Sequence, residues 1–302
     1  MNNAIESYLA IRRSVGFQLR VFEGLLLGYA RFAAQLGQKH VVSRTAINWA
    51  ALGPTQHQRA KRLDVVRIFA RHARAEDPRH EIPPEGVFLR RRPPFLPIIL
   101  THKQLNHLLV AASRLPPVNS LRPWTYCTMF SLLAVTGLRI SEALGLRLSD
   151  ITPDGLVIRE TKFRKNRLVP LHPSAVAGLE AYLRRRRRVA GGDDHVFVSL
   201  RGRTPSYPGV NAVFLSLVRN LGLHPGPGRR GTRIHDLRHG FAVRALENCG
   251  ATRKRIDQHM LALSTYMGHA KLESTYWYLH ATPVLLTDVA DTAEAFAQGA
   301  VP

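Results

Sequence analysis

The sequence has few cysteines, no long apolar run and no cluster of acidic residues. Its two cysteines, Cys127 and Cys249, show neither CxxC nor Cys/His spacing, which argues against a disulfide framework or a zinc site and suits a reducing cytoplasm. No stretch of about 18 apolar residues occurs, and the N-terminal residues do not read as a signal peptide. We therefore expect a protein without a membrane span.

Acidic residues are also scarce, with 21 Asp and Glu against 43 Lys and Arg, which gives a net charge of +22. Residues 1–95 carry 16 basic and 7 acidic residues, and the remainder carries 27 and 14, so both parts are basic. Such a balance predicts attraction to polyanions, above all nucleic acid. An arginine-rich proteome is the alternative explanation of the charge. The hydrophobic fraction of 45% is ordinary for a globular fold.

The first part of the chain has apolar residues at helical spacing, so we predict an all-α N-terminal domain over residues 1–88. Helices are expected over 7–17, 21–37, 43–52 and 55–77, with Ser43 and Thr55 as N-caps and Gly37 ending the second helix. Prolines then crowd a basic stretch, which predicts a linker over 89–100.

The remaining residues, 101–302, are expected to form a second, mainly α domain with a small β-sheet, an α+β fold. Thr101 and Gln104 have the spacing of a capping box. A buried helix is expected over 125–137, two strands joined by a basic turn over 155–172, a helix over 174–188, a short strand over 195–199 and a helix over 210–222. Another helix is expected to open at His235, and a last one to follow Tyr278.

Basic residues of the fourth helix, the linker and the hairpin turn are candidate DNA contacts. A solvated helix face is the default explanation for such side chains, but the net positive charge of the chain supports a DNA-facing surface at least as well. The candidates are Arg59, Arg62, Arg67, Arg71, Arg74, Arg90, Arg91, Arg92 and Lys165. The run Arg184–Arg188 is expected to be a solvated helix end that contributes to binding.

Arg139 occupies a tight corner between two apolar segments, directly after Gly137 and Leu138. Its planar guanidinium suits two oxygens of a phosphate. A buried salt bridge, for example with Glu142, explains the position equally well.

Lysine is rare, with 7 residues against 36 arginines, and yet Lys162 and Lys165 both fall in the expected hairpin. A lysine can act as a general acid near neutral pH if its pKa falls, whereas arginine cannot. Two solvated lysines in a turn are the common alternative.

His235 and Arg238 are three residues apart at the start of a helix, so they share a face. A helix N-terminus also attracts phosphate. His239 lies one turn after His235, which superficially suggests a metal pair, but no HExxH glutamate or carboxylate cluster accompanies it. We expect no metal, and we expect His239 to pack or to position its neighbours.

These segments, together with MGH ending at His269 and STYWYLH containing Tyr276 and Tyr278, resemble the tyrosine recombinases of the phage integrase family. The match covers about residues 101–290, and its motifs are most similar to those of a transposon-borne branch of the family. The family order is Arg, Lys, His-x-x-Arg, His or Trp, then Tyr. The resemblance therefore implies catalytic roles for Arg139, Lys162, His235, Arg238, His269 and Tyr278.

The resemblance implies a site-specific DNA recombinase or integrase, acting in transposition or integration of a mobile element. Tyr278 would form a 3′-phosphotyrosyl link, Arg139, Arg238 and His269 would stabilise charge, Lys162 would protonate the leaving 5′ oxygen, and His235 would assist proton transfer. It further implies double-stranded DNA as the partner, no cofactor, and a homotetramer or a mixed tetramer with sister recombinases. The place of action would be the bacterial cytoplasm, at the nucleoid.

Two rival functions remain open at this level. A type IB topoisomerase-like enzyme would use related chemistry to nick and close one duplex. A catalytically silent accessory protein would bind DNA without cutting it, although every catalytic position here holds a competent residue.

Overall fold

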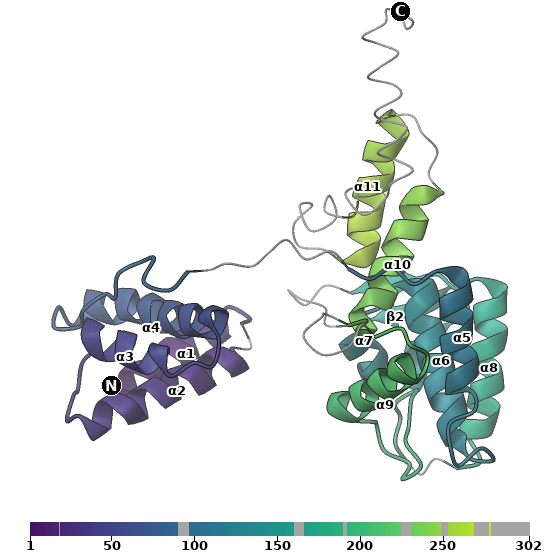
Figure 1. Cartoon of the computed structure of the whole chain (residues 1–302), viewed down its shortest axis with the longest axis horizontal. Coiled ribbons are helices and arrows are strands. Elements are labelled where there is room, and N and C mark those ends of the chain that lie inside the picture. Colours follow the sequence, from purple (N-terminus) through teal and green to yellow (C-terminus); the bar gives the residue numbers. More distant parts are fainter. Residues whose placement is uncertain are drawn as a thin grey trace, which may run out of the picture. The chain divides into compact units, whose positions relative to one another are not determined.

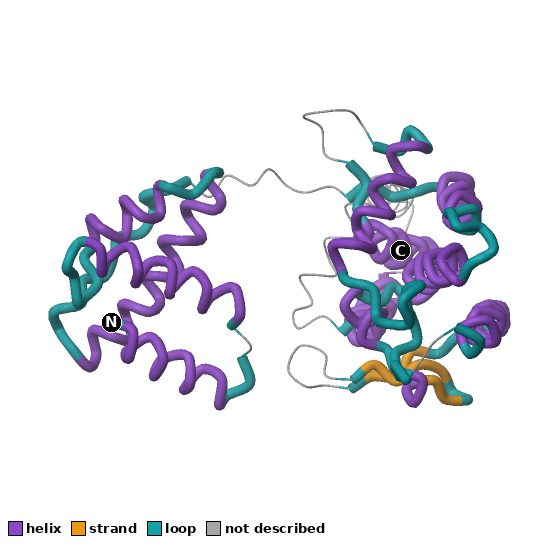
Figure 2. The backbone as a smooth tube through the Cα atoms, turned by 90° about the horizontal axis from the view of Figure 1, so that it is seen from below, coloured by secondary structure: helices purple, strands orange, loops and turns teal. Residues whose placement is uncertain are grey.

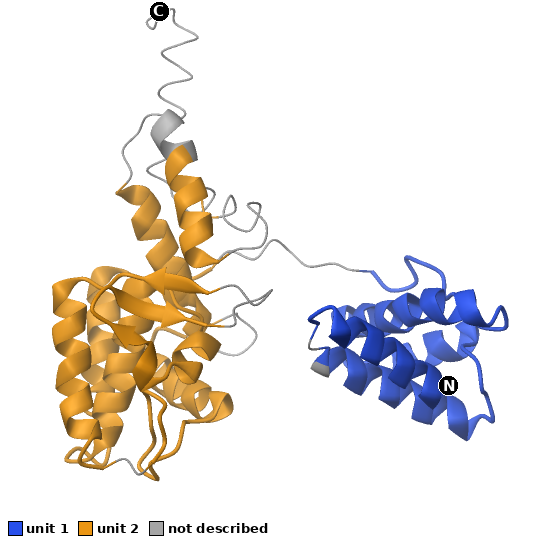
Figure 3. Cartoon of the chain, turned by 180° about the vertical axis from the view of Figure 1, so that it is seen from behind, with its two compact units in different colours: residues 1–95 blue, residues 96–302 orange. Residues whose placement is uncertain are grey.

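The computed structural model describes residues 1–17, 19–89, 97–159, 166–189, 192–224, 231–248, 253–268 and 278. The chain divides into two compact units, Met1–Phe95 and Leu96–Pro302 (Figure 3). Within the described ranges, no helix combines the length and apolar character that crossing a membrane would require.

The first unit consists of helices packed on one core (Figure 1). Aromatic residues form much of that core, because Tyr29, Trp49 and Phe69 are buried and Tyr29 meets Trp49 edge to face. Its elements are α1 (Asn2–Ser14), α2 (Arg20–Gln35), α3 (Ser43–Ala51) and α4 (Gln56–Glu76).

The helix ends of this unit correct one expected cap. Thr55 caps α4 as predicted, because its hydroxyl accepts the backbone N–H of Gln58 at 3.2 Å. Ser43 is not an N-cap; it is the first helical residue of α3, after Val42. The Glu81 carboxylate accepts the Ser43 backbone N–H at 2.7 Å instead. A carboxylate distant in the sequence therefore accepts a backbone N–H at the start of α3, where we expected the Ser43 hydroxyl to act as the cap.

The second unit is a helical body with a small antiparallel sheet at one side (Figure 2). The buried helix α6 lies at its centre and packs against α5, α8 and α10. The helices are α5 (His102–Ala112), α6 (Leu121–Thr136), α7 (Ile140–Gly145), α8 (Pro173–Arg186), α9 (Tyr207–Asn220), α10 (Ile234–Glu247) and α11 (Arg253–Met267), with a 3-10 turn at Leu148–Asp150. The mainly α fold with a small sheet agrees with the prediction.

The sheet has the order β1 (Ile151–Thr152), β2 (Gly155–Ile158) and β3 (Arg167–Val169). Leu156 pairs with Val169 and Ile158 pairs with Arg167, so β2 and β3 form the expected hairpin. Its turn, residues 160–165, lies outside the described residues. The capping box of Thr101 and Gln104 is present at the start of α5.

One expectation in this unit was wrong, and one helix was not predicted. Residues 195–199 are not a strand; His195 makes one isolated bridge with Arg147, and the neighbouring backbone bonds to the segment after α7. α11 was missed, because its apolar residues are interrupted by a basic and polar stretch.

Candidate active site

The corner between α6 and α7 sets the position of Arg139. Gly137 ends α6 in the left-handed region, at φ +64°, and Arg139 is the N-cap of α7. A Cβ on Gly137 would lie 2.5 Å from a ring carbon of Phe241 in α10. The glycine is therefore required both by its backbone conformation and by the close approach of α10.

A buried carboxylate holds Arg139 from one side. The Nη1 of Arg139 donates to Glu142 Oε1 at 2.8 Å, and Arg167 of β3 donates to both oxygens of the same carboxylate, at 3.0 and 2.7 Å. We call Arg139, Glu142 and Arg167 the Glu142 clamp. Burial would raise the pKa of Glu142, but the hydrogen bonds and charges of the arginines outweigh it and lower the pKa to about 2.

The clamp resolves the two interpretations of Arg139, because it is salt-bridged and still accessible. Its side chain is 29% exposed, whereas that of Glu142 is 8% exposed. A guanidinium has five donors in a planar fork, so one edge can be anchored on a carboxylate while another faces a ligand. The salt bridge fixes the orientation of the fork.

Arg167 was missed as a site residue. It lies on the same face of β3 as the buried Val169, while Leu168 between them is 49% exposed. An arginine on the buried face of a strand requires a carboxylate or carbonyl partner. The alternation in RLV is the sequence signal for this position, but by itself it indicates only a strand.

Arg238 of α10 is almost completely buried, at 2% exposure. It donates to the backbone carbonyls of Gly137 at 2.5 Å and Met267 at 2.7 Å, which are at the C-terminal ends of α6 and α11. Carbonyls at helix ends carry partial negative charge, so they suit a buried cation. Burial and the nearby Arg139 lower the pKa of Arg238 to about 10, so it stays charged at neutral pH.

The end of α11 brings the two arginines together. The carbonyl of Gly268 accepts Arg139 Nη2 at 3.0 Å, directly after the Met267 carbonyl that binds Arg238. Gly268 has φ +64°, and a Cβ there would lie 3.1 Å from Arg167 Nη1. The consecutive carbonyls of Met267 and Gly268 therefore position both predicted catalytic arginines, Arg238 and Arg139.

Tyr278 is 2% exposed and belongs to a buried hydrophobic cluster with residues of α10 and α11. Its hydroxyl is 2.9 Å from His239 Nδ1. Burial raises the pKa of Tyr278, and the charges of Arg238 and Arg139 oppose that rise. The electrostatic influence of both arginines places the phenol in their neighbourhood.

His235 is the outer member of a histidine pair. Its ring meets that of His239 edge to face, with centroids 4.6 Å apart. The packed protein around it, followed by the charges of Arg238, Arg233 and Arg139, lowers its pKa. The residue as a whole is exposed, so water moderates this shift, but every charge named favours the neutral ring.

The structure thus gathers Arg139, Arg238 and Tyr278 in one place and puts His235 beside them through His239. Lys162, Lys165 and His269 lie outside the described residues, as do Tyr276 and the expected helix after Tyr278. Their roles stay predictions.

The candidate DNA contacts of α4 differ in their surroundings. Arg67 is 13% exposed and pairs with Asp64 at 2.7 Å, so it is largely a structural residue. Arg59 donates to the Gly53 carbonyl at 2.7 Å, and Arg62 lies over the Trp49 ring. Arg71 pairs with an exposed glutamate, and Arg74 is exposed. Arg90, Arg91 and Arg92 lie outside the described residues.

The run Arg184–Arg188 is not uniformly solvated. Arg186 is 4% exposed and donates to the carbonyls of Asp193, His195 and Val196. It therefore connects the end of α8 to the following loop. Arg185 stacks over the Trp124 ring at 3.5 Å.

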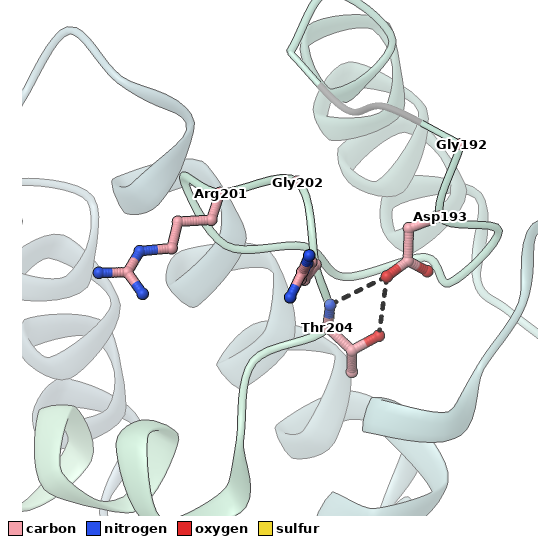
Figure 4. A pocket seen from close by; sticks show the side chains of 6 residues that line it. Gly192, Asp193, Arg201, Gly202 and Thr204 are labelled. Carbon is pink, nitrogen blue, oxygen red and sulfur yellow. Dashed lines mark hydrogen bonds between the residues drawn. The ribbon is translucent and has the colours of Figure 1, made fainter.

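An open pocket in that loop contains no predicted catalytic residue (Figure 4). Asp193 lines it and accepts the backbone N–H of Thr204 at 3.1 Å. Among the residues that the structure describes, Asp193, Asp194 and His195 are the group with metal-ligand spacing. Asp194 already pairs with Arg147, and Asp193 with His195. The three side chains are therefore engaged in ion pairs that stabilise the local fold.

Comparison with known proteins shows the family to which this chain belongs. The phage integrase family model matches residues 99–284. The integrase/recombinase y4rB of Sinorhizobium fredii is 37% identical over 296 residues, covering 94% of each chain. A tyrosine recombinase XerD of Halalkalibacterium halodurans is 31% identical over 234 residues, covering 76% of this chain and 73% of the relative. The chain belongs to the phage integrase family, the tyrosine recombinases, which cut and rejoin DNA.

Solved structures share the fold. The Tn1549 transposon integrase in complex with transposon right end DNA superposes with a TM-score of 0.66 at 18% identity, covering 96% of this chain and 98% of that one. The XerH site-specific recombinase bound to its difH substrate gives 0.67 at 17% identity, covering 90% and 79%.

Proposed function

We propose that this recombinase cuts double-stranded DNA with Tyr278 as the nucleophile and forms a 3′-phosphotyrosyl intermediate. The observation that carries the proposal is the position of the Tyr278 hydroxyl, which lies beside His239 and within the electrostatic influence of Arg238 and Arg139. A phosphate that reached the phenol would meet two arginines whose orientation is already set. Preorganised cations of this kind stabilise charge on a phosphoryl transition state without reorganisation.

The remaining roles follow the family pattern. Lys162 is proposed as the acid that protonates the leaving 5′ oxygen, His269 as a third donor to the phosphate, and His235 as an aid to proton transfer. The covalent link conserves the energy of the phosphodiester, so neither ATP nor another joining cofactor is needed. Excess EDTA should leave cleavage intact; loss in EDTA and recovery with magnesium would contradict this part.

The deciding experiment compares Tyr278→Phe with Tyr276→Phe on a radiolabelled duplex whose nick traps the covalent intermediate. Tyr278→Phe removes one oxygen, so we expect folding and DNA binding without a covalent band on a denaturing gel. Tyr276→Phe should keep the band. A covalent band from Tyr278→Phe, or loss of the band only in Tyr276→Phe, would show that Tyr278 is not the nucleophile.

The same assay separates the rival functions. A silent accessory protein would give no band from the natural sequence. A topoisomerase-like enzyme would give the band and relax supercoils as a monomer, but would not join two duplexes. Exchange between two duplexes is the expected result.

We propose the ends of a mobile element as the substrate and a tetramer, homomeric or mixed with sister recombinases, as the active assembly at the bacterial nucleoid in the cytoplasm. A transposon integrase of the same fold is bound to transposon end DNA, which supports this choice. The +22 charge supports backbone-directed binding. If about 6–10 phosphates are contacted, affinity should fall about 10³–10⁵-fold between about 50 and 200 mM salt. A nearly flat salt dependence would contradict it.

A further inference from the structure

We propose that His239 is a catalytic residue that accepts the phenolic proton of Tyr278 as the tyrosine attacks DNA. The inference deepens the proposed function and rests on Tyr278 being the nucleophile. The family resemblance implies a role in proton transfer for His235, whereas His239 was expected only to pack or to position its neighbours.

The contact itself has the geometry of proton transfer. His239 Nδ1 and the Tyr278 hydroxyl are 2.9 Å apart, and the two ring centroids are 5.4 Å apart. A candidate base has to lie within about 2.6–3.2 Å of the proton's heavy atom. His239 meets this limit, and the ring of His235 contacts that of His239, with the two centroids 4.6 Å apart.

The helix that carries His239 is rigidly placed. Its neighbours Leu237, Arg238 and Gly240 are buried, and Arg238 ties α10 to the ends of α6 and α11. Tyr278 packs with Ala242 and Val243 of the same helix. His239 and the buried ring of Tyr278 therefore lie against the same packed helix, α10.

Cationic side chains dominate the described surroundings of the proposed proton acceptor. His235 and Arg238 flank His239 on its own helix, and Tyr278 faces it. Around Arg238 lie Arg139 and Arg167, with the Glu142 carboxylate opposing them. Three guanidinium groups against one carboxylate leave a net positive charge around Arg238, which suits the approach of a phosphate to the phenol.

The proton and electron balance is complete. The phenolic oxygen forms the bond to phosphorus, and its proton moves to His239 Nδ1, with the Nε2–H tautomer becoming imidazolium. The bond from phosphorus to the 5′ oxygen breaks, and that oxygen takes a proton from Lys162, the proposed acid, or from water. When the strand is rejoined, the imidazolium returns its proton to the departing phenolate.

The test measures single-turnover formation of the covalent complex at saturating nicked DNA for His239→Asn and His239→Ala. The Asn side chain places a polar atom near the Nδ1 position but cannot take a proton in this pH range. We expect both variants to bind DNA and to be at least about 100-fold slower, the ordinary size of a general-base contribution. An Asn variant at the natural rate would show that only a hydrogen bond is needed and would overturn the proposal.

A second measurement separates proton removal from positioning. Fluorinated tyrosine at position 278 loses its proton more easily, because fluorine withdraws electrons from the ring. It should restore at least about 10-fold of the rate lost in His239→Asn, while having little effect in the natural background. No recovery would mean that His239 only holds the ring in place, and would refute the assignment.

A third measurement excludes the opposite role. A substrate with a 5′-bridging sulfur has a leaving group that needs no protonation, because a thiolate is far more stable than an alkoxide. The His239→Asn defect should persist on it; disappearance of the defect would make His239 the acid instead.

Two controls complete the design. His172→Asn should react at the natural rate, because His172 is an exposed N-cap of α8 and Asn caps equally well. The natural sequence must form the covalent band: if it does not, the proposed function fails; if it does and His239→Asn is unimpaired, this inference alone fails.

Discussion

Neutralising Glu142 should destabilise the second unit by a predictable amount. The clamp lowers the pKa of Glu142 from 4.5 to about 2, and the side chain is 8% exposed. At about 1.4 kcal/mol per pKa unit, the charged form contributes about 3 kcal/mol at neutral pH. Removing one partner from a buried ion pair leads to a similar expectation, about 3–5 kcal/mol. Glu142→Gln keeps the shape and removes the charge.

The pH dependence gives this prediction a sign. A carboxyl group whose pKa is lowered by folding stabilises the fold fully above its unfolded value, 4.5, and loses that contribution as pH falls towards 2. The difference between natural protein and Glu142→Gln should therefore be constant from pH 5 to 7 and shrink below about pH 4.

Hydrogen exchange followed by mass spectrometry is the suitable assay, because two compact units need not unfold together. Peptides from α6, α7 and β3 should lose protection equivalent to about 3 kcal/mol, and peptides from the first unit should not change. The matched control is Glu85→Gln, whose carboxylate pairs with Arg71 but is 69% exposed, so its effect should stay below about 1 kcal/mol. Equal protection in Glu142→Gln and natural protein at pH 7 would refute the reasoning.

Three further substitutions test other parts of the structure. Arg139→Lys should nearly abolish cleavage at saturating DNA, because a lysine cannot hold a carboxylate, a carbonyl and a phosphate in one plane; covalent-complex assays measure this. Arg186→Ala should lower the stability of the second unit by about 2–3 kcal/mol in denaturant unfolding by leaving buried carbonyls unpaired, whereas the exposed Arg187→Ala should change little. Thr55→Ala should cost about 1 kcal/mol in thermal unfolding of the first unit, and Ser43→Ala far less.

Each of these three predictions has an outcome that would contradict it. Cleavage by Arg139→Lys at the natural rate would make the arginine a structural residue only. Equal stability of the two α8 variants would mean that Arg186 is solvated, as its sequence context suggested. Equal effects at Thr55 and Ser43 would mean that Ser43 does cap α3.

Local chemistry allowed the sequence alone to determine much of the molecule. The apolar periodicity predicted α1 to α4, α6, α8 and α9, and short-range rules predicted the Thr101 capping box. The spacing of short motifs indicated the family and selected Arg139, Arg238 and Tyr278. These signals are readable because caps, turns and helix faces depend on residues within about four positions of each other.

Only the tertiary structure decided which charges are paired and which histidine meets the tyrosine. Arg167 contacts Glu142 across 25 positions, Arg238 contacts Met267 across 29, and His239 contacts Tyr278 across 39. Glu81 reaches Ser43 across 38 positions and replaces the expected cap. Arg186 looks like its four neighbours in the sequence and is buried because carbonyls of the following loop surround it. A buried charge needs a partner, but the identity of that partner depends on how the helices pack. It therefore cannot be predicted from a local sequence pattern.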